Sequence, residues 1–243
     1  AKATQNSGVG KNTSKREGFA FDTLIADRYR VQNGPLGEIS GEAEVYECFD
    51  DINKETIAVK LYYYQATPKA DIIQILQQLN HPNIVNLYRH GEWRGRFYEV
   101  MEFCAGGVMS EYMPHSEDEL RHALTGIIHA LDHCHRQGII HRDIKPNNLF
   151  FNNAEQREPL LGDFGISSYL EQNTDIRRTQ TAANLTLDYA APELLDGHEV
   201  SAKTDYYSLG ITLLHLLRGL SPFFGLNQND ILVSHLRGRV SLP

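Results

Sequence analysis

The sequence predicts an α+β fold, with an antiparallel sheet in the first part of the chain and mainly helices in the second. Strand-like runs separated by polar turns fill residues 29–61, which is the pattern of a β-meander. An amphipathic helix is expected after Ser116, and an apolar helix over Asp205–Leu217. Residues 1–18 are polar, small and basic without periodicity, so we place a flexible tail or linker at 1–26.

The composition excludes several classes of protein. The 243 residues carry a net charge of −8, whereas a nucleic-acid surface needs clustered excess lysine and arginine, so we expect no nucleic-acid partner. Three scattered cysteines, Cys48, Cys104 and Cys134, include no CxxC pair, which favours a reducing, cytoplasmic location. No apolar run reaches the length of a membrane span, so no membrane segment is expected in this fragment. The oligomeric state stays open.

Five strands and one helix are expected in the first part of the chain. The helix begins near Pro68 and ends near Asn80, because Ile72, Leu76 and Leu79 form one apolar stripe. The Gly106-Gly107 pair ends the last strand. The expected strands are Tyr29–Leu36, Val45–Phe49, Ile57–Leu61, Val85–Tyr88 and Arg96–Met101, with a turn from Gly91 to Gly95 before the last one.

The second part of the chain is expected to begin with a capped helix. Ser116 and Glu119 form a capping box, and the helix that they open continues to about Gln137. Two short apolar runs, Gly138–Ile140 and Leu149–Phe151, then enclose a polar loop, which is typical of a connection between buried strands. The expected buried face of the helix comprises Leu120, Leu124, Ile127, Ile128, Leu131 and Cys134.

Four short motifs follow one another along the chain in a characteristic order. They are Ile57-Ala58-Val59-Lys60, His141-Arg142-Asp143-Ile144-Lys145-Pro146-Asn147-Asn148, Asp163-Phe164-Gly165 and Ala191-Pro192-Glu193. Each matches by chance often enough, but the series matches the protein-kinase signature set. The chain resembles the catalytic domain of eukaryotic-like Ser/Thr protein kinases, in a style similar to that of bacterial members.

The resemblance implies a bilobal kinase fold. Its small N-lobe, an antiparallel sheet with one helix, would occupy residues 27–101, and residues 102–107 would form the hinge. Its larger, mainly helical C-lobe would occupy residues 108–243. The family carries further helices at its C-terminal end, so the C-lobe is expected to be truncated. Asp205 resembles the aspartate that braces the backbone of the family's catalytic loop.

The resemblance also implies transfer of the ATP γ-phosphoryl group to Ser or Thr hydroxyls of protein substrates. Asp143 would be the base and Lys145 would meet the phosphoryl group, in the Ser/Thr form that pairs this lysine with Thr186. Lys60 would contact the α- and β-phosphates. Asp163 and Asn148 would hold Mg²⁺, with Mn²⁺ as a possible substitute. His141 is expected to pack and hydrogen-bond rather than to act as an acid or base.

Nucleotide binding is implied for a further set of residues, although the glycine-rich loop departs from the family pattern. Registered on Val45, the pattern requires glycine where this chain has Glu38, Ser40 and Ala43. Glu42 and Glu44 also add negative charge near a polyanion. Met101 is expected as the gatekeeper, with backbone groups of Glu102 and Cys104 reading adenine. The implied nucleotide-binding residues are Lys60, Gly37, Ser40, Gly41, Ala43, Val45, Ala58, Met101, Glu102, Cys104, Leu149 and Asp163.

Two regulatory features are expected. The family's helix glutamate, which pairs with the strand lysine, should fall at position 72, where this chain has isoleucine. Asp71 could take that role only if the helix is rotated or frayed at its start; otherwise it is a solvated acid that favours the helix N-terminus. A phosphate on Thr179 or Thr181 could pair with Arg142 and order the activation segment, or these threonines could be plain loop hydroxyls.

Three functions are compatible with these residues. An active protein kinase is favoured because Lys60, Asp143, Asn148 and Asp163 are all present in order. A pseudokinase that serves as a binding or scaffold module is the alternative, supported by the altered glycine loop and the missing helix glutamate. A small-molecule phosphotransferase is disfavoured by Lys145 and Thr186, which serve peptide substrates in the family.

Overall fold

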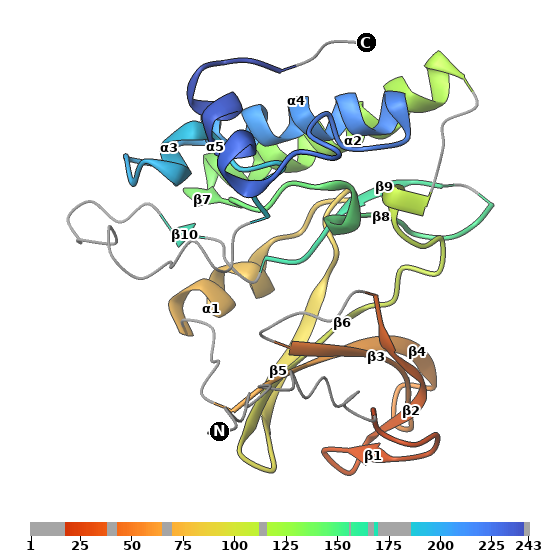
Figure 1. The fold of residues 1–243 in the computed structure, drawn as a ribbon. Coiled ribbons are helices and arrows are strands. Elements are labelled where there is room, and N and C mark those ends of the chain that lie inside the picture. The colour runs from red at the N-terminus through yellow and green to blue at the C-terminus, as the bar shows by residue number, and fades with distance from the viewer. Residues whose placement is uncertain are drawn as a thin grey trace, which may run out of the picture.

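The computed structural model describes residues 18–37, 43–64, 70–111, 116–155, 157–164, 168–169 and 186–240. Ser40, Gly41, Thr179 and Thr181 therefore lie outside the described residues. The chain forms two lobes, with the sheet in the lower half of Figure 1 and most of the helices in the upper half. None of the helices in these ranges combines the length and apolar character needed to cross a membrane.

The N-lobe is built on a six-stranded antiparallel sheet. In spatial order its strands are β1 (Leu24–Ile25), β2 (Tyr29–Leu36), β3 (Ala43–Asp50), β4 (Glu55–Tyr62), β6 (Arg96–Glu102) and β5 (Leu87–Trp93). Alternate side chains of the strands meet in one apolar cluster that includes Ile25, Tyr46 and Val59, all fully buried. Because β4 is central and buried over most of its length, it holds Lys60 on a rigid support.

Helix α1 (Ala70–Gln78) lies between the sheet and the larger lobe (Figure 1). Leu76 and Leu79 at its C-terminal end are buried in the same cluster as Ile127 and Leu149 of the larger lobe. Ile84, just beyond the helix, forms a parallel bridge with Leu161. The segment after α1 therefore joins the two lobes through apolar packing.

The C-lobe core is formed by two long helices. Helices α2 (Glu117–Arg136) and α4 (Ala202–Arg218) contribute Leu131, Leu209 and Leu216 to this core. The smaller elements are the strands β7 (Ile139–Ile140), β8 (Leu149–Phe151), β9 (Pro159–Leu161) and β10 (Ser168–Tyr169), the helices α3 (Pro192–Leu195) and α5 (Gln228–Leu236), and short 3-10 turns at Met109–Glu111 and Pro146–Asn148.

The Ser116 half of the capping box predicted for α2 is present. The Ser116 side chain accepts a hydrogen bond from the backbone N–H of Glu119, at 3.2 Å, and so satisfies one of the free donors of the first turn. One residue of the predicted buried face is wrong, because Ile128 is 43% exposed. It lies one position beyond Ile127, which rotates it about 100° away from the core.

Two boundaries also differ from the predictions. The tail expected at 1–26 is too long, since Ile25 is fully buried and Phe19 packs edge-on against Trp93, with ring centroids 5.4 Å apart. The strand expected at Val85–Tyr88 instead spans Leu87–Trp93. Several successive residues of this strand are exposed, so it shows no alternating apolar pattern. Its hydrogen bonds to β6 define it instead.

Candidate active site

A buried aspartate of α4 fixes the polar loop between β7 and β8. Asp205 is fully buried, and its carboxylate accepts hydrogen bonds from the backbone N–H of His141 (2.9 Å) and of Arg142 (2.7 Å). The ring of His135 donates a third bond at 2.7 Å. Arg142 has a φ of 72°, which non-glycine residues rarely adopt. Asp205 therefore holds Arg142 in a backbone conformation that arginine rarely adopts. This agrees with the bracing role that the family resemblance implies for Asp205.

Asp143 is the most highly coordinated side chain of this loop. Its Oδ2 accepts hydrogen bonds from Lys145 Nζ and from Asn148 Nδ2, each at 2.8 Å. Lys145 Nζ also donates to Thr186 Oγ1 at 2.9 Å, and that hydroxyl lies 3.4 Å from Asp143 Oδ1. Three groups from separate positions in the sequence therefore fix the orientation of one carboxylate.

Lys60 reaches from the sheet to Asp163, which follows β9. Lys60 Nζ and Asp163 Oδ1 are 2.5 Å apart, and the lysine is 8% exposed. Burial alone would raise the pKa of Asp163, but the ammonium group of Lys60 outweighs it and lowers this pKa to about 2. Burial acts on Lys60 in the opposite sense, yet the Asp163 carboxylate raises its pKa above the ordinary value. Both groups are therefore charged at neutral pH.

Backbone contacts bring Asp163 beside the loop. His141 is fully buried and its Nε2 donates to the carbonyl of Gly162 at 2.9 Å, so the histidine packs and hydrogen-bonds as expected. The N–H of Gly162 donates to the carbonyl of Asn148 at 3.1 Å. Asp163 has a φ of 57°, and these two bonds to its neighbour hold it there. Lys60, Asp143, Asn148 and Asp163 thus converge, although they come from both lobes of the chain.

Asn148 and Asp163 fit a hard divalent cation. The two hydrogens of Asn148 Nδ2 are used by the carbonyl and the carboxylate of Asp143, both at 2.8 Å. This orientation leaves the amide oxygen as the atom available to a metal. The Asp163 side chain is 40% exposed, so a carboxylate oxygen remains accessible beside Lys60. Oxygen ligands of this kind suit Mg²⁺.

Comparison with known proteins agrees with this geometry. A sequence profile described as the protein kinase domain matches residues 34–242. The chain belongs to the protein kinase family. The fold class predicted from the sequence is therefore confirmed.

Several curated kinases are similar to this chain. Serine/threonine-protein kinase PrkC of Bacillus subtilis is 32% identical over 224 residues, and a probable serine/threonine-protein kinase PknB of Lactococcus lactis is 32% identical over 230 residues. Each alignment covers 88% of this chain but only 34% and 35%, respectively, of the relative. PknJ of Mycobacterium tuberculosis is 40% identical over 158 residues, which is 60% of this chain and 25% of the relative. The chain spans about a third of the length of the first two relatives.

One face of the sheet carries two rows of side chains that include predicted nucleotide contacts. Strand pairing aligns Val45, Lys60 and Glu99 in one row, and Ala58 with Met101 in the next. Because side chains alternate along a strand, Glu44 lies on the opposite face. There its carboxylate pairs with Arg96 at 2.9 Å. The negative charge that the sequence suggested near the phosphates is therefore neutralised at this position.

The structure describes some of the predicted nucleotide contacts in the glycine-rich loop and at the hinge. Gly37 has a φ of 72°, and a Cβ added to it would meet nothing within 4 Å, so the space around it is open. Ala43, at the start of β3, is buried. At the hinge, the N–H of Glu102 donates to the carbonyl of Asn86 (3.0 Å), and the carbonyl of Cys104 accepts from Gly107 (3.1 Å). If adenine also contacts the Cys104 carbonyl, that oxygen would accept from both the adenine and the Gly107 N–H.

One predicted contact residue is buried in this structure. Leu149 is 0% exposed and belongs to the hydrophobic core with Ile127 and Leu131. Its neighbour Phe150 lies on the other face of β8, beside Gly162. A contact between Leu149 and the nucleotide stays a prediction.

Glu99 shares a face of β6 with the predicted gatekeeper Met101, and the sequence analysis did not single it out. It stands two residues before Met101 on the same strand, and residues two apart on a strand share a face.

The side chain of Asp71 lies outside those that the structure describes, as do Thr179 and Thr181. The Arg142 side chain is partly buried, and this burial lowers its pKa from the ordinary value for arginine.

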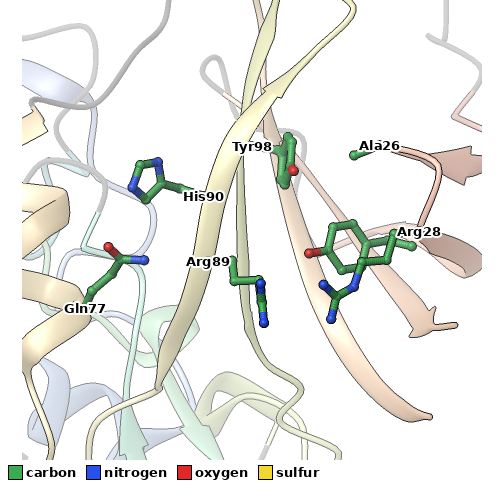
Figure 2. Close-up of a pocket in the computed structure, with 7 residues that line it drawn as sticks. Ala26, Arg28, Gln77, Arg89, His90 and Tyr98 are labelled. Carbon is green, nitrogen blue, oxygen red and sulfur yellow. The ribbon is translucent and has the colours of Figure 1, made fainter. Parts of the chain in front are cut away.

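A separate hollow of about 330 Å³ lies on the N-lobe, away from these residues. Figure 2 shows side chains from α1 (Gln77), from β5 (Arg89 and His90) and from the β1–β2 hairpin (Arg28) around it. The guanidinium of Arg28 is already paired with Asp50 at 2.6 Å. No carboxylate is among the described residues that line the hollow, and we assign no part of the chemistry to it.

Proposed function

We propose that the chain is a Ser/Thr protein kinase that transfers the γ-phosphoryl group of ATP to Ser or Thr hydroxyls of protein substrates. The observation that carries the proposal is the convergence of Asp143, Lys145 and Thr186 on one side and the Lys60–Asp163 ion pair on the other. The relatives named as serine/threonine-protein kinases support the same activity. Nothing in the described residues favours the pseudokinase alternative over it.

In this proposal Asp143 is the general base. The substrate hydroxyl oxygen forms a bond to the γ-phosphorus, the bond from that phosphorus to the bridging oxygen breaks, and ADP leaves. Asp143 accepts the hydroxyl proton, for which a positioned base contributes about 10²–10⁴-fold. The bonds from Asn148 and Lys145 keep its carboxylate aimed at one point, and such positioning is most of what phosphoryl transfer requires of a protein.

Two lysines place positive charge where the phosphates would lie. Lys145 adjoins Asp143, so its ammonium group stabilises the oxygens of the group in transfer. Lys60 orients the α- and β-phosphates from the other side. Asn148 and Asp163 would hold Mg²⁺, or Mn²⁺ in its place. When bound, the cation neutralises charge on the phosphate oxygens.

Location and regulation are further parts of the proposal. Cys48, Cys104 and Cys134 are free thiols, which supports a reducing compartment such as the cytoplasm. Autophosphorylation at Thr179 or Thr181 would supply a phosphate for Arg142. Mass spectrometry after incubation with Mg·ATP should find phosphate between residues 165 and 190, and its absence there would contradict this part.

The direct test is phosphate transfer from γ-labelled ATP to a generic basic protein in the presence of Mg²⁺. We expect labelled phosphoserine or phosphothreonine with the wild-type chain. Asp143→Ala should lower the rate by about 10²-fold or more because the base is lost. Equal rates for the two proteins would refute the assignment of Asp143.

A further inference from the structure

A buried carboxylate faces the nucleotide-binding lysine from the neighbouring strand. Glu99 on β6 is 7% exposed and is the Cα partner of Lys60 on β4. Residues directly opposite in an antiparallel pair have Cβ atoms about 4.5–5.5 Å apart and share a face of the sheet. Glu99 therefore lies on the cleft side, next to the stem of Lys60.

The surroundings of Glu99 act on its charge in opposing directions. A buried carboxylate is costly unless it is hydrogen-bonded and paired with a cation. The hydroxyl of Tyr62 donates to Glu99 Oε2 at 3.1 Å, and the ring of Tyr62 lies 5.2 Å from Lys60 Nζ. Burial is the largest influence and raises the pKa of Glu99 above its ordinary value, while the Lys60 ammonium and the Tyr62 hydroxyl act in the opposite direction. Tyr62, Glu99 and Lys60 thus form one buried polar cluster on two adjacent strands.

If Asp163 binds a metal ion, Lys60 loses its present carboxylate partner. In this structure its ion pair is with Asp163, which the proposed function assigns to a metal ion. Position 72 of α1, where the family's pairing glutamate is expected, is isoleucine. Among the described residues, Glu99 is the other carboxylate that acts electrostatically on Lys60.

We propose that Glu99, held by Tyr62, is the positioning residue of Lys60, and that it supplies from the sheet the charge that the family supplies from the helix. This inference rests on the proposed function, since it concerns the same nucleotide site. Both residues belong to one sheet, so their proximity does not depend on the position of α1. Lys60 is consequently kept in place for the phosphates without a movement of the helix.

The pairing is tested without nucleotide by a double-mutant cycle. Lys60→Met, Glu99→Gln and the combined variant are compared with the wild type by urea unfolding. Because Glu99→Gln keeps shape and an acceptor for Tyr62, it removes mainly the charge. We expect the combined effect on the unfolding equilibrium to differ from the product of the single effects by about fivefold or more. Additive effects would overturn the proposal, and an inactive wild-type chain would leave this test intact.

The positioning role is tested by nucleotide affinity. Glu99→Gln should weaken Mg·ADP binding, measured by calorimetry, and raise the KM for ATP, each by about tenfold, and it should change kcat less. Glu92→Gln, which removes an exposed charge from β5, should leave both values unchanged. Asp50→Asn removes a different buried carboxylate of the same sheet and should affect stability only. Unchanged affinity in Glu99→Gln would contradict the proposal.

Discussion

The catalytic loop in the C-lobe and the nucleotide edge of the N-lobe differ in how closely they keep the family's pattern. In the loop, Asp143, Lys145 and Asn148 are all present, and Asp205 clamps the backbone from α4. In the N-lobe the glycines are out of register, the helix glutamate is replaced by Ile72, and a glutamate stands buried on β6.

The difference follows from what each region has to do. A base must present one carboxylate at one place, so its position and its partners cannot be exchanged for others. A counter-charge for Lys60 only has to be close, hydrogen-bonded and ionised, and two different elements can supply it. The C-lobe site is therefore specified residue by residue, whereas the N-lobe site is specified by its electrostatics.

The largest effect on activity is expected at Asp163, which lies where the catalytic loop and the N-lobe lysine meet. Asp163→Asn removes both the partner of Lys60 and an oxygen ligand suited to a metal. We expect kcat/KM for ATP to fall by about 10²–10³-fold, since such charge stabilisation is usually the largest single contribution. Steady-state kinetics should show this loss, whereas Asp132→Asn, at an exposed ion pair on α2, should behave as wild type. Full activity of Asp163→Asn would contradict the account.

Asp205→Ala should damage the C-lobe site without touching the cleft. Its removal leaves the N–H groups of His141 and Arg142 without their buried acceptor. We expect the free energy of unfolding to fall by about 3 kcal/mol, as for other broken buried charge networks. Urea unfolding measures the loss, and activity at low temperature should fall as well. A stable variant with normal kcat would show that the loop does not depend on α4.

Thr186 offers a smaller test of the same region. Thr186→Ala removes the hydroxyl that accepts from Lys145, so this lysine loses one of the two partners that orient it. The expected loss in kcat is about tenfold. Thr186→Ser keeps the hydroxyl and should retain most of the activity. If both variants lose activity equally, the hydroxyl is not the relevant group.

Asp50 is a buried carboxylate of the N-lobe sheet whose expected role is in stability and not in nucleotide binding. The Arg28 guanidinium lowers the pKa of Asp50 to about 2, below its value of about 3.9 in the unfolded chain. A lowered pKa stabilises the fold above the unfolded value, and that stability is lost as the pH falls from about 4 to about 2. Asp50→Asn should cost about 2 kcal/mol at pH 7 and almost nothing at pH 2. Thermal unfolding across this range measures it; a cost that does not change with pH would refute the pairing.

The sequence predicts the C-lobe site well because its information is local. Asp143, Lys145 and Asn148 lie within six residues of one another, so their order alone indicates a shared loop. The brace from Asp205 was predictable from the resemblance to the family, although α4 begins at Ala202 and not at Asp205 as the sequence suggested. The contact between Lys145 and Thr186 needed only the family pattern.

The sequence predicts the N-lobe site less well because pairing between strands decides it. Glu99 becomes a neighbour of Lys60 only through the register of β4 and β6, which no local pattern encodes. Phe19 and Ile25 were placed in a tail because single apolar residues carry no periodicity.

The most direct test of the account is calorimetric titration of the wild-type chain with ATP, with and without Mg²⁺. Because Lys60 and Asp163 converge with Asn148, we predict one nucleotide per chain. Its affinity should fall by about an order of magnitude or more when EDTA removes the cation. Absence of binding at millimolar nucleotide, or equal affinity with and without Mg²⁺, would contradict the claim that these residues form a metal-dependent nucleotide site.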